Sequence, residues 1–399
     1  METKHNFVQL AEAQRKQETL YCAGLDPHSF GSYKRNMEVY GFRDDGEVNG
    51  EVRKDRIFYF YLSLCEAAGV NVNESKKVAG LIAAIERYFC EVIRILIKQC
   101  NVRVFKPQFG LYIQLGPPGS FLLYRIREYI SELEKTYGRI IIILDCKPGD
   151  IATTQAGYFL GYMGNLKDAW GIDYTPYGFD IINPTPWMGE DTMVLEEKGK
   201  QLIGLGLLRQ GKGLIYVNKT SNPSGPQYQN LIVSDRDEGN NNHSIELIKG
   251  IGLKPTLALV NAADAYFLSQ KYDLEIGGLS QLGLVIGATY PCDGSIRQVF
   301  PLYTGLNPGF GAQSKDKPPI TPFQKVMLEL IRQGEWNGQG CIFSSSRGAL
   351  FPWEKSFEGS GDVNNLEGDL IAAVEFHRMI EHQAYELPKV KAAGIEYPF

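Results

Sequence analysis

The chain has 399 residues, of which 44% are hydrophobic and 22% are charged, so it can bury a large core and lacks the composition of a disordered chain. Its formal net charge of -5 gives no general attraction to nucleic acid or to anionic membranes, and any basic site must be local.

Cysteine usage and the apolar runs bear on the compartment. The seven cysteines are an odd number without CxxC spacing, which is typical of a reducing environment. The N-terminal segment is too polar for a signal peptide, and the longest apolar runs are far too short to cross a bilayer. We therefore expect a cytoplasmic protein with no membrane or nucleic-acid partner.

Short β-branched runs alternate with helix-like stretches along the whole chain. The runs are near-continuously hydrophobic, as expected of parallel strands that are buried on both faces. Eight of them can be counted, at residues 19–26, 102–108, 140–147, 179–186, 213–220, 282–289, 299–306 and 340–346. This pattern predicts an α/β fold of the (β/α)8 TIM-barrel type.

Helical periodicity is clear between and after these runs, at residues 74–100, 121–138, 323–336 and 365–386. The first two strands are separated by about 75 residues, far more than a usual βα unit contains. We expect one barrel domain over residues 1–399, with a mainly helical and loop insertion at about 28–100.

Charged residues stand where several of the predicted strands end, which is where TIM barrels place their active sites. They are Asp26 after the first strand, Lys106 on the second, and Asp145 and Lys147 on the third. Because Asp145 and Lys147 are two apart, they should face the same side of that strand. Alternating lysines and carboxylates can stabilise an anion that develops between them. The alternative is a strand end capped by surface salt bridges.

Asp150 follows Pro148 and Gly149, so it has left the third strand and can reach a neighbouring subunit. Phosphate sites of these barrels are made by the loops after strands seven and eight, here residues 306–313 and 344–348. Their glycines, with Gln313 and Arg347, predict a phosphate site, whereas ordinary turns are the alternative.

Other polar residues give weaker signals. Of the five histidines, at positions 5, 28, 243, 377 and 382, only His377 and His382 are close in sequence, and five positions apart on a predicted helix they are not well aligned for a metal. All five are expected at the surface, so no metal site is predicted. Asn183 and Asp191, near the end of the fourth strand, are candidates to support the catalytic side chains.

Six sequence blocks occur in the order typical of one family: GLDP at 24–27, FKPQ at 105–108, DCKPGDIATT at 145–154, TSNP at 220–223, IGAT at 286–289, and LNPGFGAQ followed by SSSRG. On these blocks the chain resembles the orotidine 5'-monophosphate decarboxylase family. The resemblance implies conversion of orotidine 5'-monophosphate to UMP and CO2 in de novo pyrimidine biosynthesis, by a homodimer that uses neither metal nor organic cofactor.

The resemblance also implies roles in the reaction. Lys147 would protonate C6 of the pyrimidine as CO2 leaves, and Asp145 would lie beside the substrate carboxylate. Lys106 and Asp150 would complete the charge network. Asp150 and Thr154 would be contributed across the dimer interface.

The remaining implied roles concern substrate binding. Asp26 would bind ribose hydroxyls, and Ser221 would contact the pyrimidine edge. Gln313 and Arg347 would hold the phosphate, beside a candidate lid at 310–322.

Two other functions stay open on the sequence. A sugar-phosphate decarboxylase or aldolase on the same barrel would use Mg2+, but a metal-using relative would prefer a carboxylate at Lys106. A non-catalytic nucleotide-binding paralogue would keep only the phosphate site, whereas this chain retains all four charged residues of the reaction network.

Overall fold

The computed structural model describes residues 5–28, 56–193, 195–197, 200–234, 242–288, 295–309, 336–346, 350 and 365–399. Eight parallel strands form a closed barrel in the order β1-β12-β11-β10-β7-β4-β3-β2. Their bounds are β1 Tyr21–Leu25, β2 Val104–Pro107, β3 Ile141–Leu144, β4 Ile181–Ile182, β7 Gly213–Lys219, β10 Leu282–Ile286, β11 Gly305–Pro308 and β12 Cys341–Ser345. The TIM-barrel prediction is therefore confirmed.

Seven of the eight predicted strands contain an observed strand, and the remaining one is displaced. The prediction placed a strand at 299–306, but α13 (Ser295–Val299) occupies its start and β11 begins only at Gly305. Val299 and Phe300 are fully buried at the end of α13 and in the turn that follows. Their burial made a helix end look like the start of a strand.

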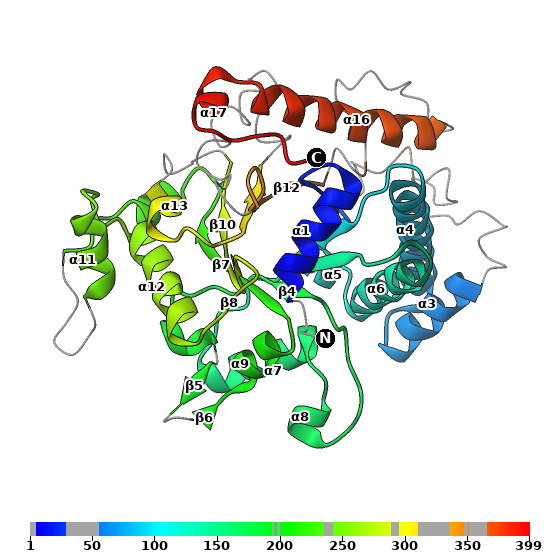
Figure 1. Ribbon diagram of the computed structural model, residues 1–399. Coiled ribbons are helices and arrows are strands. Elements are labelled where there is room, and N and C mark those ends of the chain that lie inside the picture. Colours follow the sequence, from blue (N-terminus) through cyan, green and yellow to red (C-terminus); the bar gives the residue numbers. More distant parts are fainter. Residues whose placement is uncertain are drawn as a thin grey trace. The chain divides into compact units, whose positions relative to one another are not determined.

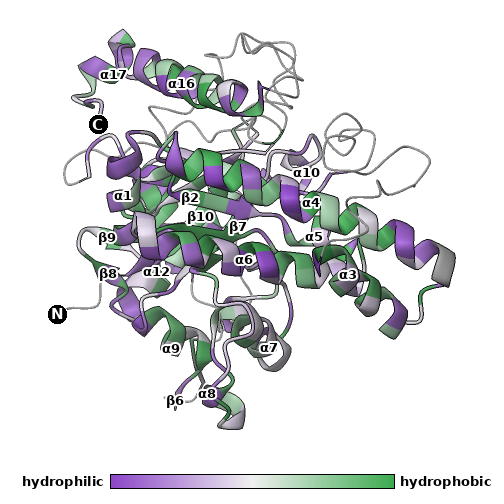
Figure 2. Ribbon diagram, turned by 90° about the vertical axis from the view of Figure 1, so that its right-hand side faces the viewer, coloured by the Kyte–Doolittle hydropathy of each residue, from purple (hydrophilic) through white to green (hydrophobic). Residues whose placement is uncertain are grey.

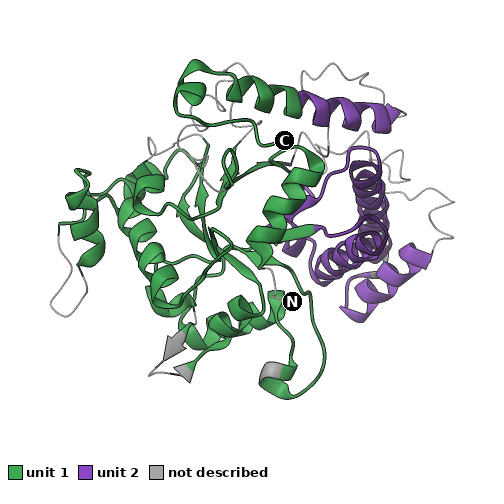
Figure 3. Ribbon diagram, viewed as in Figure 1, with its two compact units in different colours: residues 1–22, 141–345, 377–399 green, residues 23–140, 346–376 purple. Residues whose placement is uncertain are grey.

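Contacts divide the chain into two compact units, coloured separately in Figure 3. Unit 1 contains residues 1–22, 141–345 and 377–399, and unit 2 contains residues 23–140 and 346–376. Both units contribute strands to the barrel, and the expectation of a single domain stays a prediction.

Unit 1 carries most of the strands and the helices that cover them. Figure 1 shows α12 running outside β7 and β10, and it contacts both strands. The helices of unit 1 are α1 Asn6–Gln17, α7 Ala152–Met163, α8 Lys167–Trp170, α9 Ile203–Arg209, α10 Pro226–Gln229, α11 His243–Gly250, α12 Leu257–Lys271, α13 and α17 Pro388–Ala392, with the 3-10 helix η3 Glu190–Met193. Two short antiparallel pairs accompany them, β5 Glu196–Glu197 with β6 Lys200–Gln201, and β8 Glu275–Ile276 with β9 Leu279–Ser280.

Helix α1 closes the end of the barrel at which the strands begin. A Cβ atom built on Gly213, at the start of β7, would lie 2.9 Å from the Phe7 ring, and one on Gly283 of β10 would lie 3.2 Å from the same ring. Phe7 is fully buried. The side chain of Gln14 donates to the carbonyl of Cys341 at 2.8 Å. The candidate site lies at the opposite end of the barrel, where the strands finish.

Unit 2 contains α3 Arg56–Ala67, α4 Val72–Lys98, α5 Phe109–Ile113 and α6 Pro117–Tyr137. Hydrophobic and hydrophilic residues alternate along α4 in Figure 2, as expected of a helix with one buried face. Glu86 of α4 accepts hydrogen bonds from Tyr61 of α3 at 2.5 Å and from Arg125 of α6 at 2.8 Å. These bonds tie the three helices together around one buried carboxylate.

Helix α16 (Leu366–Tyr385) bears on two predictions. The expected helix at 365–386 is confirmed, whereas the expected helix at 323–336 lies outside the described residues except for Trp336. The prediction of surface histidines is wrong for His5, which is buried, and for His377, whose side chain is only 12% exposed. His5 caps α1, accepting from the Phe7 amide at 3.2 Å, with its Nε2 2.7 Å from the Ile276 carbonyl oxygen.

None of the helices in the described parts of the chain combines the length and apolar character that crossing a membrane requires.

Candidate active site

The turn after β3 holds the first pair of candidate residues. The prediction that Asp145 and Lys147 both belong to a strand is wrong, because β3 ends at Leu144. Lys147 adopts a φ of 46°, in the left-handed region that costs a residue other than glycine about 1–2 kcal/mol. The side chains nevertheless meet, and the Lys147 ammonium forms an ion pair with Oδ1 of Asp145.

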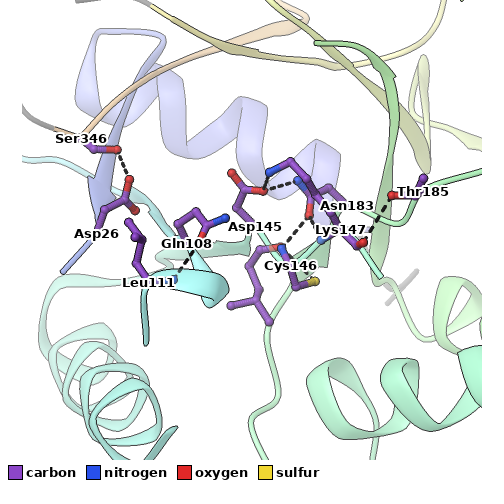
Figure 4. Close-up of polar contacts among 10 residues, drawn as sticks. Asp26, Gln108, Leu111, Asp145, Cys146, Lys147, Asn183, Thr185 and Ser346 are labelled. Carbon is purple, nitrogen blue, oxygen red and sulfur yellow. Dashed lines mark hydrogen bonds and ion pairs between the residues drawn. The ribbon is translucent and has the colours of Figure 1, made fainter. Parts of the chain in front are cut away.

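Asn183, just beyond the end of β4, holds this turn in place (Figure 4). Its Oδ1 accepts hydrogen bonds from the backbone amides of Cys146 at 2.8 Å and Lys147 at 3.0 Å. Its Nδ2 donates to Oδ1 of Asp145 at 2.7 Å. The expectation that Asn183 supports the catalytic side chains therefore has a geometric basis, whereas Asp191 is exposed in η3.

The ion pair lies at the boundary between core and solvent. The Asp145 side chain is 11% exposed and that of Lys147 is 41% exposed, so the carboxylate is buried while the ammonium reaches water. Between them, burial first and the Asp145 charge second raise the pKa of the Cys146 thiol. Cys146 is therefore a protonated thiol at neutral pH and not a nucleophile.

Asp150 and Thr154 lie at the start of α7. Asp150 is partly exposed and accepts a hydrogen bond from the Ile151 amide at 2.8 Å, while Thr154 is exposed on the first turn of the helix. Ile151 between them is 59% exposed. Both predicted site residues are thus accessible from outside the chain.

Ser221 follows β7 and is half-buried. A Cβ atom on Gly287, just past β10, would lie 2.6 Å from the Ser221 backbone, so only glycine permits this close approach. Lys219, the last residue of β7, is buried and donates to Oδ1 of Asn230 at 3.0 Å. Lys219 was not among the predicted site residues, although, like Lys106, it lies near the end of a predicted strand.

In unit 2, the strands β1 and β2 place Asp26 and Lys106 close to the ends of neighbouring strands. Lys106 pairs in register with Gly24, and both Asp26 and Lys106 are buried. Oδ2 of Asp26 accepts a hydrogen bond from the Ser346 hydroxyl (Figure 4). A Cβ atom on Gly24 would collide with Ser346, so the glycine of the GLDP block makes room for this bond.

Helix α5 supports the GLDP turn from the other side. The Tyr112 hydroxyl donates to the Leu25 carbonyl at 2.8 Å, and the side-chain amide of Gln114 donates to the Pro27 carbonyl at 2.8 Å. Gln108, at the N-cap of α5, accepts from the Leu111 amide at 3.0 Å. The backbone around Asp26 is thereby anchored to a helix that follows β2.

The phosphate-site prediction extends beyond the described chain. Gln313 and Arg347, and the candidate lid at 310–322, lie outside the described residues. In the part that is described, no group of three or more histidine, cysteine, aspartate or glutamate side chains could hold a metal ion.

Comparison with known proteins gives relatives among the orotidine 5'-phosphate decarboxylases. No family model matches the chain. The orotidine 5'-phosphate decarboxylase of Rhodopirellula baltica is 27% identical over 305 residues, which cover 76% of this chain and 85% of that protein. The orotidine 5'-phosphate decarboxylase of Leptothrix cholodnii is 26% identical over 351 residues, covering 87% and 89%.

Solved structures show the same fold. Orotidine 5'-monophosphate decarboxylase of Plasmodium berghei superposes with a TM-score of 0.60 at 15% identity, over 97% of this chain and all of that one. OMP decarboxylase of Leishmania donovani gives a TM-score of 0.54 at 18% identity, over 94% of this chain and 98% of that one.

Proposed function

Because the chain belongs to the orotidine 5'-phosphate decarboxylase family, we propose that it converts orotidine 5'-monophosphate to UMP and CO2. The observation that carries the proposal is the ion pair of Asp145 and Lys147, held by Asn183 where β3 ends. A cation and a carboxylate fixed at this end of a TIM barrel suit a reaction that develops negative charge on carbon.

The chemical step needs one cation and one proton. The bond between C6 of the pyrimidine and its carboxylate carbon breaks, CO2 leaves, and the electron pair stays on C6. The Lys147 ammonium stabilises that charge and then transfers a proton to C6. Its partial exposure supports the return of a proton from water after each turnover. Electrons and atoms balance without a metal ion, an oxidant or a reductant.

The other charged residues act around this step. Asp145 lies beside the substrate carboxylate, and two donors, Lys147 and Asn183, fix its position. Lys106, which is buried on β2, supplies the second cation of the network. A fixed arrangement of charges needs no reorganisation when the transition state forms, which is the main source of electrostatic catalysis.

Substrate binding is assigned to residues at other strand ends. Asp26 accepts hydrogen bonds from ribose hydroxyls, as it does from the Ser346 hydroxyl in this structure. Ser221 contacts the pyrimidine edge. Gln313 and Arg347 bind the phosphate, and the binding energy of that remote group contributes to the rate as well as to the affinity.

We further propose a homodimer in which Asp150 and Thr154 of one chain complete the site of the other. Their exposure at the start of α7 supports this assignment. Large apolar side chains at the N-cap of α7, within it and after it are also exposed: Ile151, Tyr158, Trp170, Ile172 and Tyr174. Exposed apolar residues in such number are typical of a surface that another protein covers.

The direct test of the activity follows the ultraviolet absorbance of orotidine 5'-monophosphate with purified protein in excess EDTA. We expect the orotate absorbance to disappear at an undiminished rate as EDTA is added. Turnover that requires Mg2+ would instead favour the sugar-phosphate class of enzyme, and no turnover with or without Mg2+ would contradict the proposal.

A further inference from the structure

Asn183 contacts the proposed catalytic turn with both ends of its side-chain amide. The oxygen accepts from two consecutive backbone amides, at 2.8 Å from Cys146 and 3.0 Å from Lys147, and the nitrogen donates to the Asp145 carboxylate at 2.7 Å. The side chain is only 1% exposed. No other side-chain type offers an acceptor and a donor in this planar arrangement except glutamine, which is longer by one methylene group.

The two backbone bonds act on an unfavourable conformation. Lys147 has a φ of 46°, which lysine rarely adopts unless its surroundings impose it. Two amide groups that converge on one oxygen hold the backbone in that state. If the oxygen is removed, both amides lose their acceptor and Lys147 can return to negative φ, which turns its side chain away from Asp145.

A second residue of the same segment fastens the far side of the turn. The Thr185 amide donates to the Pro148 carbonyl at 2.7 Å, and the Thr185 hydroxyl donates to the Lys147 carbonyl at 3.3 Å. Figure 4 shows Asn183 and Thr185 approaching the turn from the same stretch of chain. The residues that follow β4 thus enclose the turn that follows β3.

We propose that Asn183 is a positioning residue, which aligns the Lys147 ammonium with the Asp145 carboxylate for the decarboxylation proposed above. It touches neither the substrate nor the reacting carbon, and acts through the backbone of Lys147 and the carboxylate of Asp145. The inference rests on the proposed function for its catalytic meaning, while its geometric part can be tested without any substrate.

The chain offers a closely matched control in Asn165, in the loop after α7. Its Oδ1 also accepts from two backbone amides, Lys167 at 2.8 Å and Tyr174 at 3.2 Å, and its Nδ2 donates to Oδ1 of Asp173 at 2.9 Å. Asn165 also donates to the Thr175 hydroxyl at 3.1 Å and is half-buried, so it makes a similar set of bonds in a more exposed place away from the catalytic turn. Comparing Asn183→Leu with Asn165→Leu separates the effect of losing an asparagine that bonds two backbone amides from the effect of losing Asn183 at the catalytic turn.

The kinetic experiment compares these two variants with Asn183→Asp, which keeps the shape of asparagine but places a second carboxylate beside Asp145. We expect kcat to fall about 100-fold in Asn183→Leu, because a displacement of about 1 Å can have that effect, while KM changes less than about threefold. In Asn183→Asp the acidic limb of the kcat profile should move to higher pH, because two neighbouring carboxylates retain a proton. Because Asn165 holds the loop of the proposed dimer surface, Asn165→Leu is assayed only as a purified dimer, and in that form it should change neither kcat nor the profile.

Two further measurements keep the outcomes distinct. Thermal unfolding shows whether Asn183→Leu has lost more stability than Asn165→Leu. If it has, the positioning role is judged from the kcat and pH profile of the isosteric Asn183→Asp variant. A crystal structure of Asn183→Leu without substrate should show Lys147 at negative φ and its ammonium separated from Asp145. If wild-type protein does not decarboxylate the nucleotide, the proposed function fails while this structure still tests the positioning role. Unchanged kcat, pH profile and Lys147 conformation would overturn the inference.

Discussion

Two buried carboxylates of unit 1 lie at opposite ends of the barrel strands and have different surroundings. Asp145, where β3 ends, has a lysine cation and an asparagine amide as partners. Glu381 of α16, where β1 begins, accepts from the Thr19 hydroxyl at 2.8 Å and the Leu20 amide at 3.0 Å. His377 Nε2 lies 3.4 Å from its Oε1. The first carboxylate has a full charge opposite it, and the second is surrounded mainly by neutral donors.

The surroundings of Glu381 determine its protonation state. Burial raises the pKa of Glu381 to about 8 and lowers the pKa of His377 to about 3, so both are neutral near pH 7. Their contact at 3.4 Å is therefore not an ion pair near neutral pH. A buried carboxylate suits electrostatic catalysis where the fold also fixes a cation beside it, as at Asp145, whereas Glu381 packs among mainly neutral donors.

The largest expected effect concerns the proposed active site around Asp145, and tests whether a second chain contributes residues to it. Lys147→Ala and Asp150→Ala should each be inactive as homodimers. When the two variants are co-expressed with different tags, half of the dimers are mixed, and each mixed dimer has one intact site. Activity should recover to about a quarter of the wild-type value.

The same experiment has an internal control in the two separately purified variants. Recovery of activity requires that Lys147 of one chain and Asp150 of another meet in one site. If the purified mixed dimer is as inactive as either parent, the shared site is wrong.

A smaller effect concerns the Glu381 end. Because its pKa is raised from 4.5 to about 8 on folding, its contribution to stability is full below pH 4.5 and is lost as pH rises to about 8. The free energy of unfolding falls by at most about 1.4 kcal/mol per pH unit over that range. Glu381→Gln has no proton to lose, so its melting temperature should rise relative to wild type between pH 5 and pH 8, with kcat unchanged. The prediction is contradicted if the melting temperatures of wild type and Glu381→Gln change in parallel with pH, or if kcat falls as it would in a catalytic variant.

Much of the fold follows from local sequence. Parallel barrel strands are buried on both faces and appear as continuous apolar runs, so seven of the eight were located from the sequence. The strand predicted at 299–306 was displaced because a buried helix end has the same apolar composition as a strand. Residues 29–55, in the predicted insertion, lie outside the described structure.

The candidate site was predictable in its residues but not in its geometry. Asp145 and Lys147 are recognisable from their spacing, yet the left-handed conformation of Lys147 depends on Asn183, which is 36 positions further along the chain. The bond between Asp26 and Ser346 spans 320 positions. Contacts of this range leave no local pattern, and only the closure of the barrel brings them about.

The most direct test of the account compares wild-type protein with Lys147→Ala in the same absorbance assay, with nucleotide binding measured in parallel. We predict that wild type consumes orotidine 5'-monophosphate in EDTA. Lys147→Ala should bind UMP but lose turnover by a factor of at least about 1000, since a group that stabilises the developing charge and supplies the proton is removed. Turnover that persists in a clean preparation of Lys147→Ala would contradict it.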